Sequence, residues 1–420
     1  MLVKWSRDIS VKNKTLYKNT FMLYLMTAAK YILPLVTLPY LTRVLEPDGY
    51  GIITYMTAMM TYFQLFVDFG FNYSATKVAS ENRDNRTKLS LLLGDVIAAK
   101  IVLVIISAVF LFILIPYIAI LKENILLTYL YFSSVLISIF LPDYIYRGIE
   151  KMEIITVRYV IAKLISAVLI LVFVKDKSDL LWIPVLYTIG TGVAVAFSWY
   201  HVLKKLNLKL CWLKLHNVWS TLKDSGVYFV AVFATTAFSA TNIILMGFSS
   251  ITTQEIAYWG VAYQVITAIQ ALYDPIISSV YPHMVAKRDY GLIKKILMFI
   301  MPVIIMGIAV SYWLADLAIY IVAGSGYSAA APIFCLLLPV LFFSFPAQLL
   351  GFPVLGTMGK EKLATRATII SATFHGTGLV ALFISGSFTL INIAILRSCT
   401  EAALCLFRVI FVIAMRYMKH

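Results

Sequence analysis

Charged side chains within long apolar runs are the residues of this sequence that could do chemistry. At the centre of a bilayer, each such charge costs about 2.5–3.5 kcal/mol. Because that cost is too high for all of them to face lipid, we expect them to line a hydrated cavity, to pair with one another, or to reach the interface. The basic ones are Lys30, Lys100, Arg158, Lys163, Arg397 and Arg408, and the acidic ones are Asp68, Asp95, Asp143, Asp274, Asp316 and Glu401.

Charges four residues apart predict ion pairs at two places. Asp143 and Arg147 are interpreted as a structural pair, and Arg397 can pair with Glu401 in the same i,i+4 geometry. At about 100° per residue, Arg408 projects within roughly 40° of that second pair. Because a guanidinium binds phosphate bidentately, this helical face predicts a cavity wall that receives a diphosphate. The alternative is a structural salt bridge, with Arg408 close to the inner headgroups.

Other basic residues complete the predicted substrate site. Lys30 and Lys163 lie near mid-depth of their runs, so we expect both to face a cavity, and pairing with a buried aspartate is the alternative. Arg43 and Arg158 lie nearer opposite interfaces, where a long side chain can instead reach the headgroups. The candidate substrate-binding residues, for a diphosphate or a glycan, are Lys30, Arg43, Arg158, Lys163, Arg397 and Arg408.

Three acidic residues are candidates for ion coupling. Asp68 and Asp274 lie 206 residues apart at equivalent depths of their runs, and Glu401 lies within the last run. Each carboxylate could titrate or bind a cation, so H⁺ and Na⁺ are the coupling ions we consider. The alternative is that Asp68 and Asp274 accept hydrogen bonds at helix breaks, and Pro275 favours such a break directly after Asp274.

The elements that position these charges are predicted to be transmembrane helices. Apolar residues make up 61% of the 420 residues and charged residues 13%, against about 45–50% and 25% in soluble domains. A span needs about 20 apolar residues, so about 12 spans fit, and the run over 21–41 is expected to be a span rather than a cleaved signal. The predicted spans are 19–44, 49–75, 89–116, 124–148, 154–175, 180–204, 223–249, 253–282, 295–321, 329–357, 364–387 and 389–415.

The sequence carries no pattern typical of an enzyme or of a metalloprotein. P-loop, GxSxG and DxD patterns are absent, the four cysteines lack CxxC spacing, and the five histidines lack metal-ligand spacing. We therefore expect a non-enzyme with no cofactor and no metal. The net charge of +15 is divided among seven segments rather than gathered on one face with aromatics, which excludes nucleic acid as a partner.

Loop charges and a weak internal repeat predict how the spans are organised. Lysine and arginine gather in alternate connections, so the positive-inside rule places both termini in the cytoplasm. The stretch from Lys151 to Thr156 resembles that from Lys360 to Thr365, 209 residues later. We therefore predict two six-helix bundles, 1–204 and 223–420, as parallel repeats around a central cavity. Residues 205–222 are predicted to be a cytoplasmic linker that lies at the interface and contacts membrane lipid.

Several stretches resemble the polysaccharide-transport (Wzx-type) flippases of the multidrug/oligosaccharidyl-lipid/polysaccharide exporter superfamily. Residues 39–45 (PYLTRVL), 49–51 (GYG) and 66–76 (FVDFGFNYSAT) are similar to the N-terminal signature of that family. Residues 146–152 (YRGIEKM) resemble its stretch after the fourth span, with Arg147 where glutamine is common, and 356–361 (GTMGKE) resemble the matching stretch after the tenth. The substitution at Arg147 puts in doubt any role of an amide there.

The resemblance implies an all-α integral membrane protein of the bacterial inner (cytoplasmic) membrane. It implies that the protein moves an undecaprenyl-diphosphate-linked oligosaccharide, a repeat unit of O-antigen, lipopolysaccharide or capsule, from the cytoplasmic to the outer leaflet. It further implies alternating access coupled to an ion, as in an antiporter. A polysaccharide polymerase and a chain-length regulator are the partners it suggests.

Three alternatives remain open from the sequence. A multidrug exporter of the same superfamily would be expected to have an acidic, apolar cavity. The buried charges do not distinguish a lipid II exporter from an oligosaccharide flippase. A membrane-embedded glycan polymerase or glycosyltransferase would be expected to carry a large outer loop or an acidic catalytic motif. A structural scaffold or a channel is disfavoured by the repeat.

Overall fold

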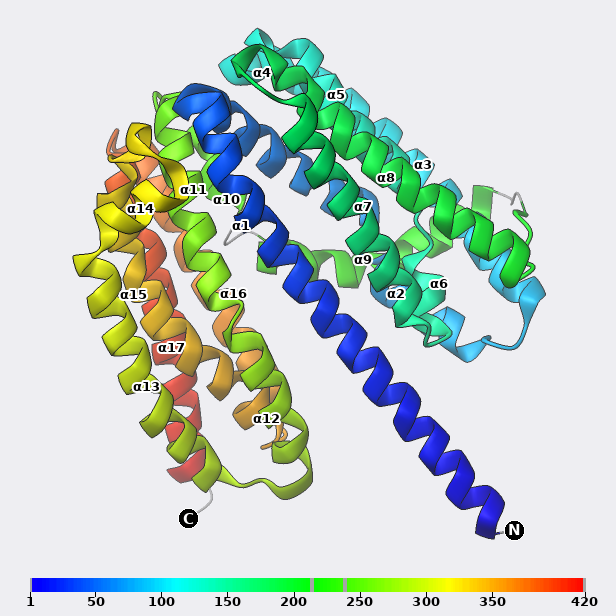
Figure 1. The fold of residues 1–420 in the computed structure, drawn as a ribbon. Coiled ribbons are helices and arrows are strands. Elements are labelled where there is room, and N and C mark those ends of the chain that lie inside the picture. Colours follow the sequence, from blue (N-terminus) through cyan, green and yellow to red (C-terminus); the bar gives the residue numbers. More distant parts are fainter. Residues whose placement is uncertain (1, 212–214, 237–239, 418–420) are drawn as a thin grey trace. The chain divides into compact units, whose positions relative to one another are not determined.

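The computed structural model describes residues 2–211, 215–236 and 240–417, and these residues form helices and turns without a strand. Helices are expected in apolar runs of this length, because a bilayer offers no partner to an unpaired backbone group. The first half contains α1 (Leu2–Asp68), α2 (Phe71–Glu81), α3 (Arg86–Leu114), η1 (Ile115–Tyr117), α4 (Ala119–Glu123), α5 (Ile125–Ser138), α6 (Asp143–Gly148), α7 (Met152–Phe173), η2 (Lys177–Leu181), α8 (Trp182–Tyr200) and η3 (His201–Lys205) (Figure 1).

The second half has the same character. Its elements are α9 (Leu215–Thr236), α10 (Ala240–Met246), α11 (Thr253–Gln270), α12 (Tyr273–Lys287), α13 (Tyr290–Trp313), α14 (Ala315–Ala323), η4 (Ser325–Tyr327), α15 (Ala330–Leu349), η5 (Leu350–Gly356), α16 (Glu361–Ile384) and α17 (Leu390–Tyr417). Among them, α15 packs against both α13 and α17, and the three lie side by side in Figure 1.

Nine stretches of the described residues are long and apolar enough to cross a membrane. The first, Lys18–Glu81, contains two of the predicted spans. The long helix α1 runs through both of them and is kinked between them, where Glu46 leaves the helical region (φ 54°) directly before Pro47. The predicted spans 223–249 and 253–282 correspond to shorter pieces, α9 with α10 and α11 with α12. An all-helical, multi-pass membrane fold is therefore confirmed, and the number of twelve spans stays a prediction.

The chain forms two compact units. Unit 1 comprises Met1–Leu33 and Met56–Phe233, and unit 2 comprises Pro34–Tyr55 and Ala234–His420. One boundary between the units therefore falls inside α1. The predicted bundles, 1–204 and 223–420, divide the chain by its repeat instead, and that division stays a prediction. Of the predicted linker 205–222, residues 212–214 lie outside the described residues, and α9 has begun by Leu215.

Each unit has its own apolar core. In unit 1, Phe71, Tyr144 and Tyr146 are almost fully buried where α2 and α6 meet α3. In unit 2, Tyr273 packs edge-on against Phe345 at a centroid distance of 5.2 Å. Burial of large aromatic side chains contributes strongly to stability, so these clusters hold the helix pieces that carry the charges.

Two helix ends repeat the same backbone geometry with the offset seen in the sequence. Glu150 (φ 59°) and Gly359 (φ 72°) both adopt the left-handed conformation. The N–H of the next residue then donates to the carbonyl five residues earlier. The two bonds run from Lys151 to Tyr146 and from Lys360 to Leu355, and each is 2.9 Å long. These bonds make a Schellman motif, which ends the helix and starts the next. The two stretches that suggested the internal repeat thus begin after the same kind of turn, and the repeat itself stays a prediction.

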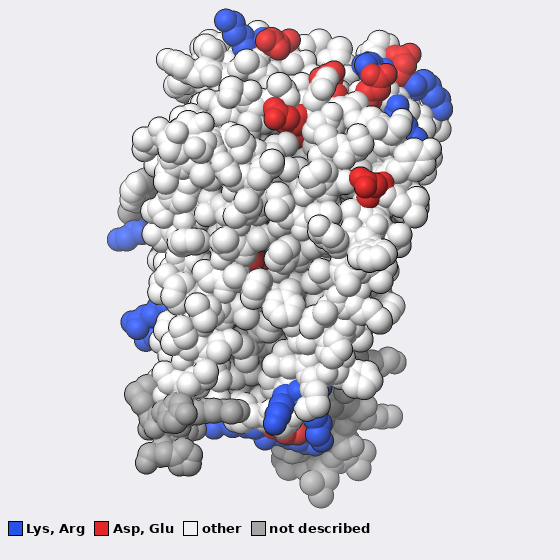
Figure 2. Space-filling model, turned by 90° about the vertical axis from the view of Figure 1, so that its left-hand side faces the viewer, with Lys and Arg blue, Asp and Glu red and all other residues white. Residues whose placement is uncertain are grey.

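Charged residues are unevenly distributed on the face drawn in Figure 2. Lysine, arginine, aspartate and glutamate lie mostly towards its two ends, and most of the band between them is white. Such a band is the surface that a hydrocarbon layer would cover.

Candidate functional site

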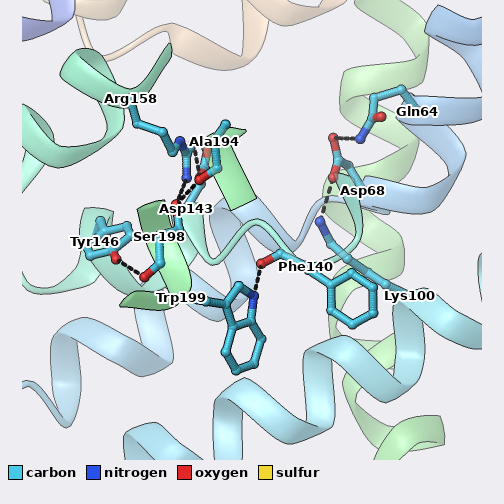
Figure 3. A network of polar contacts seen from close by, with 10 residues as sticks. All are labelled: Gln64, Asp68, Lys100, Phe140, Asp143, Tyr146, Arg158, Ala194, Ser198 and Trp199. Atoms are coloured by element: carbon cyan, nitrogen blue, oxygen red, sulfur yellow. Dashed lines mark hydrogen bonds and ion pairs between the residues drawn. The ribbon is translucent and has the colours of Figure 1, made fainter. Parts of the chain in front are cut away.

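A carboxylate at the break between α1 and α2 accepts hydrogen bonds from two side chains of unit 1. Asp68 is the last residue of α1, and its Oδ1 accepts from Lys100 Nζ at 2.7 Å. Its Oδ2 accepts from Gln64 Nε2 at 3.0 Å (Figure 3). Ser138 Oγ donates in turn to Gln64 Oε1 at 2.8 Å. The Lys100 side chain is 5% exposed and that of Asp68 30%. Asp68 therefore neutralises a buried lysine while keeping part of its own surface accessible.

The break itself depends on backbone conformation and close packing. Phe69 (φ 40°) and Gly70 (φ 78°) both lie in the left-handed region, so the helix cannot continue. A Cβ on Gly70 would lie 2.7 Å from the Cβ of Tyr228 on α9, and Phe69 stacks on Phe229 at a centroid distance of 4.7 Å. Glycine at position 70 therefore permits both the turn and the approach of α9.

A second ion pair of unit 1 joins α6 to α7. Arg158 donates from NH2 to Asp143 Oδ1 at 2.5 Å and from NH1 to Ser198 Oγ on α8 at 2.8 Å (Figure 3). Ser198 donates in turn to the Ala194 carbonyl at 2.9 Å, and Tyr146 donates to the Ser198 carbonyl at 3.0 Å. The Arg158 side chain is only 3% exposed. This predicted substrate-binding residue is therefore engaged in a buried network.

The network corrects the predicted pairing of Asp143 with Arg147. The carboxylate of Asp143 pairs with Arg158, fifteen residues later and on a different helix. The reason is the break before α6: Asp143 is the first residue of a helix of only six residues, which begins after Pro142. The break before α6, rather than the i,i+4 spacing to Arg147, therefore determines which guanidinium the Asp143 carboxylate reaches.

The two mid-depth lysines of unit 1 are exposed. Lys30 Nζ lies 5.8 Å from the ring centroid of Tyr31, and Lys163 Nζ lies 5.3 Å from that of Tyr187. A cation over an aromatic face is weakly stabilised, by about 0.5–1 kcal/mol at an exposed site. Neither ammonium is paired with a carboxylate among the described residues. Both remain available to an anion.

The predicted i,i+4 pair on α17 is confirmed in unit 2. Arg397 donates to Glu401 Oε2 at 2.6 Å, and the two side chains are 6% and 10% exposed. Arg408 donates from NH1 to the Ala347 carbonyl at 2.6 Å and from NH2 to Thr368 Oγ1 at 3.0 Å. Arg408 thus holds the end of α15, where the chain passes into the π-helical turn η5.

The other two predicted residues of unit 2 lie near helix breaks, Arg43 three residues before the kink of α1 at Glu46 and Asp274 at the start of α12. Arg43 is exposed, and its guanidinium donates to the Pro39 carbonyl at 2.7 Å and to the Ile321 carbonyl at 2.8 Å. Asp274 is half-buried in the first turn of α12, just after the break that follows α11. The helix break expected directly after Asp274 lies before this residue instead, because Pro275 falls in the first turn of α12, where its missing N–H leaves no helix bond unmade.

The structure joins few of the predicted residues directly. Arg397 and Glu401 contact each other, whereas Asp68 and Arg158 pair with residues outside the predicted set. His375 was not predicted, although it is buried and bonded to Asn242 and Thr400. A histidine within an apolar run is the signal that could have identified it. No group of three or more potential metal ligands lies among the described residues.

Comparison with known proteins places the chain in a family. Residues 16–287 match the family described as "Polysaccharide biosynthesis protein". The chain belongs to this family. It is 28% identical to a protein of Escherichia coli (strain K12) named "Putative O-antigen transporter", over 83% of this chain and 85% of that protein. A protein of the same name from Shigella dysenteriae is 25% identical, over 85% of this chain and 90% of that protein.

Solved structures share the fold. The inward closed conformation of the lipid II flippase MurJ matches with a TM-score of 0.74 and 13% identity, over 94% of this chain and 87% of that one. An inward-facing multidrug resistance MATE family transporter of the MOP superfamily matches with a TM-score of 0.69 and 11% identity, over 95% and 100%. The prediction of a transporter fold is confirmed. The named relatives are transporters and a flippase, not enzymes.

Proposed function

We propose that the protein is a flippase for a lipid-linked oligosaccharide. The proposed substrate is an undecaprenyl-diphosphate-linked repeat unit, which moves from the cytoplasmic to the outer leaflet of the bacterial inner membrane by alternating access. The observation that carries the proposal is the similarity to two named O-antigen transporters over more than four fifths of this chain. Family membership and the transporter fold support it.

Two lysines within the spans suit the diphosphate headgroup best. Arg158 and Arg397 already neutralise carboxylates, so binding an anion there would break a buried pair. Within the described part of the chain, Lys30 and Lys163 contact aromatic rings and no carboxylate, and an ammonium binds phosphate as a point charge. We therefore place Lys30 and Lys163 first among the six substrate-binding candidates, with Arg43 and Arg408 second because backbone carbonyls hold them.

Ion coupling is part of the proposal. Asp68, Asp274 and Glu401 are the acidic candidates, and H⁺ and Na⁺ are the candidate ions. A proton or cation at Asp68 would compete directly with Lys100, which lies 2.7 Å away. Both termini are proposed to lie in the cytoplasm, and a polymerase and a chain-length regulator are the proposed partners.

Complementation tests the transport and the two lysines together. In a strain that lacks its own O-antigen transporter, the wild-type chain should restore surface polysaccharide. Lys30→Glu and Lys163→Glu should lower transport about tenfold or more, because a hydrogen bond to a charged group contributes about 1.5–3 kcal/mol. Lys122→Glu, at an exposed lysine on α4, is the matched control and should transport normally.

The readouts are surface polysaccharide and the amount of lipid-linked precursor on the cytoplasmic leaflet. Membrane abundance of each variant is measured in parallel. If the wild-type chain restores no surface polysaccharide at normal abundance, the proposed function is wrong. If both lysine reversals transport as well as Lys122→Glu, the headgroup site lies elsewhere.

A further inference from the structure

The guanidinium of Arg147 in unit 1 lacks the partner that its spacing predicts. Asp143, four residues earlier, pairs with Arg158 at 2.5 Å instead (Figure 3). No hydrogen bond or ion pair joins the Arg147 side chain to another residue that the structure describes. A basic side chain near the end of the candidate span Ile125–Gly148 therefore keeps a charge that no described carboxylate neutralises.

Arg147 differs from the other arginines whose guanidinium is partly buried. Among the described side chains, four arginines have a buried Nε that donates to no acceptor: Arg147, Arg158, Arg397 and Arg408. In Arg158 and Arg408, both terminal nitrogens donate to protein oxygens. Arg397 donates from NH1 to Glu401. Because buried donors in native proteins are nearly always paired, the Arg147 guanidinium is suited to an acceptor that the described chain does not supply.

The packing of α6 holds Arg147 at a fixed and accessible place. The four other residues of this helix after its first are buried, and only Asp143 and Arg147 keep part of their surface accessible. These two residues share one helical face, because they are four positions apart. A Cβ on Gly148 would lie 2.4 Å from the Cβ of Ala79, so α6 lies directly against α2. Arg147 therefore extends from the accessible face of a short helix that has little room to move.

Carboxylates that could neutralise Arg147 are mostly engaged elsewhere. The three that are nearest along the chain each pair with another basic residue: Asp143 with Arg158, Glu150 with Arg83, and Glu153 with Lys18. Asp95 of α3 is half-buried, and its Oδ1 is buried without a donor among the described residues. No ion pair joins Asp95 to Arg147 in the described part of the chain. Asp95 is therefore the one alternative partner that the experiments have to separate from a ligand.

A diphosphate headgroup suits Arg147 in geometry, charge and depth. A planar guanidinium can donate two parallel N–H bonds to phosphate oxygens. Arg147 is the second-last residue of its candidate span, which is the depth at which a membrane protein meets lipid headgroups. Loop charges predict that this end faces the cytoplasm, where basic groups between helices bind anionic headgroups. The diphosphate of a lipid-linked precursor lies at that level while its tail stays in the bilayer.

We propose that Arg147 binds the diphosphate of the lipid-linked substrate at the predicted cytoplasmic end of unit 1. Its guanidinium holds the headgroup in the inner leaflet before the headgroup reaches the mid-span lysines Lys30 and Lys163. This site rests on the proposed function and deepens it, because it adds a residue outside the six candidates and a first binding step. Glutamine, which is common at this position in the family that the sequence resembles, carries no charge, so the contact is a property of this chain.

Binding can be measured without transport. The full chain is placed in phosphatidylcholine nanodiscs and titrated with a short fluorescent polyprenyl diphosphate. Arg147→Gln should weaken binding about tenfold or more, because a hydrogen bond to a charged group is lost. Arg147→Lys keeps the charge without the planar fork and should bind with intermediate affinity. Arg83→Gln, at an exposed arginine paired with Glu150, is the matched control and should bind as the wild type does. Equal affinities of Arg147→Gln and the wild type overturn the proposal.

Competition identifies the anion. Unlabelled polyprenyl diphosphate should displace the probe from the wild-type protein. Phosphatidylglycerol, which carries a single phosphate diester, should not displace it at the same mole fraction. Inorganic pyrophosphate, which has the two phosphates and no lipid tail, should not displace it at the same concentration. Equal displacement by phosphatidylglycerol or by pyrophosphate would assign the site to a different anion and overturn the proposal.

A structural role of Arg147 predicts different results. Arg147→Gln should melt as the wild type does, because no bond to a described residue is lost. Asp95→Asn combined with Arg147→Gln should bind the probe as weakly as Arg147→Gln alone. If Asp95→Asn restores either the melting temperature or the binding of Arg147→Gln, Arg147 neutralises Asp95 and the proposal is overturned.

Transport of a lipid-linked oligosaccharide separates this site from the proposed function. In proteoliposomes, Arg147→Gln should move the substrate several-fold more slowly than the wild type at low substrate concentration, and the difference should narrow as the concentration rises. If the wild type moves no substrate while Arg147 still binds the diphosphate probe, the proposed function fails and the binding site stands. If the wild type transports and Arg147→Gln binds the probe normally, the binding site fails and the proposed function stands.

Discussion

The buried pair of Asp143 and Arg158 should behave asymmetrically when either partner is removed. Asp143→Asn leaves the guanidinium of Arg158, whose side chain is 3% exposed, without a negative partner. Breaking a buried ion pair in this way costs about 3–5 kcal/mol. Arg158→Met instead leaves Asp143, which is 24% exposed and lies in the first turn of α6, where a carboxylate is favoured. That loss should be smaller, about 1–3 kcal/mol.

The double variant makes the prediction sharper. Asp143→Asn with Arg158→Met removes both charges, and replacing a buried ion pair by apolar groups is often close to neutral. We therefore expect the double variant to be more stable than Asp143→Asn alone, by about 2 kcal/mol. The exposed pair of Arg83 and Glu150, 47% and 49% exposed at 3.2 Å, is the control. Glu150→Gln should cost less than about 1 kcal/mol for the loss of that pair.

Equilibrium unfolding in mixed detergent micelles is a suitable assay. Tryptophan fluorescence reports on the region, because Trp199 donates to the Phe140 carbonyl at 2.9 Å beside the network (Figure 3). Free energies of unfolding for the two single variants and the double variant complete a double-mutant cycle. The reasoning is refuted if Asp143→Asn unfolds as the wild type does, or if the two single losses simply add.

Three further predictions concern the backbone and one surface loop. Gly70→Ala should destabilise the protein by more than about 1 kcal/mol in thermal unfolding, because φ at position 70 is 78° and the new Cβ would meet Tyr228. An unchanged melting temperature would contradict the close approach of α9 at this turn. Glu150→Gly should be more stable than Glu150→Gln by about 1 kcal/mol, because glycine relieves a φ of 59°, and equal melting temperatures would argue against that strain. Hydrogen bonds from the Ser178 hydroxyl and N–H hold the pKa of Asp176 below its usual range. The turn that begins at Asp176 should therefore be protected at neutral pH and should loosen as the pH falls through that pKa. Amide hydrogen exchange of this turn should accelerate with falling pH in the wild type, and the change should be smaller in Ser178→Ala.

Local patterns in the sequence were sufficient to predict those features that depend on interactions between neighbouring residues. The apolar runs predicted helices that cross a membrane, because the period of a helix and the thickness of a bilayer fix what such a run can do. Arg397 and Glu401 were predicted as a pair because residues four apart meet on any helix. The stretches that begin at Lys151 and Lys360 look alike in the sequence for the same reason, since the Schellman turn before each involves only six neighbouring residues.

Tertiary structure decided which distant charges meet. The partner of Asp143 is Arg158 rather than Arg147, because a helix break turns the carboxylate towards another helix. The partner of Asp68 is Lys100, 32 residues away, and spacing carries no information about such a contact. The sequence alone determined that these charges lie within membrane helices and need compensation. Which groups provide it depends on how helices pack, because packing, not spacing, brings residues from separate helices within hydrogen-bond distance.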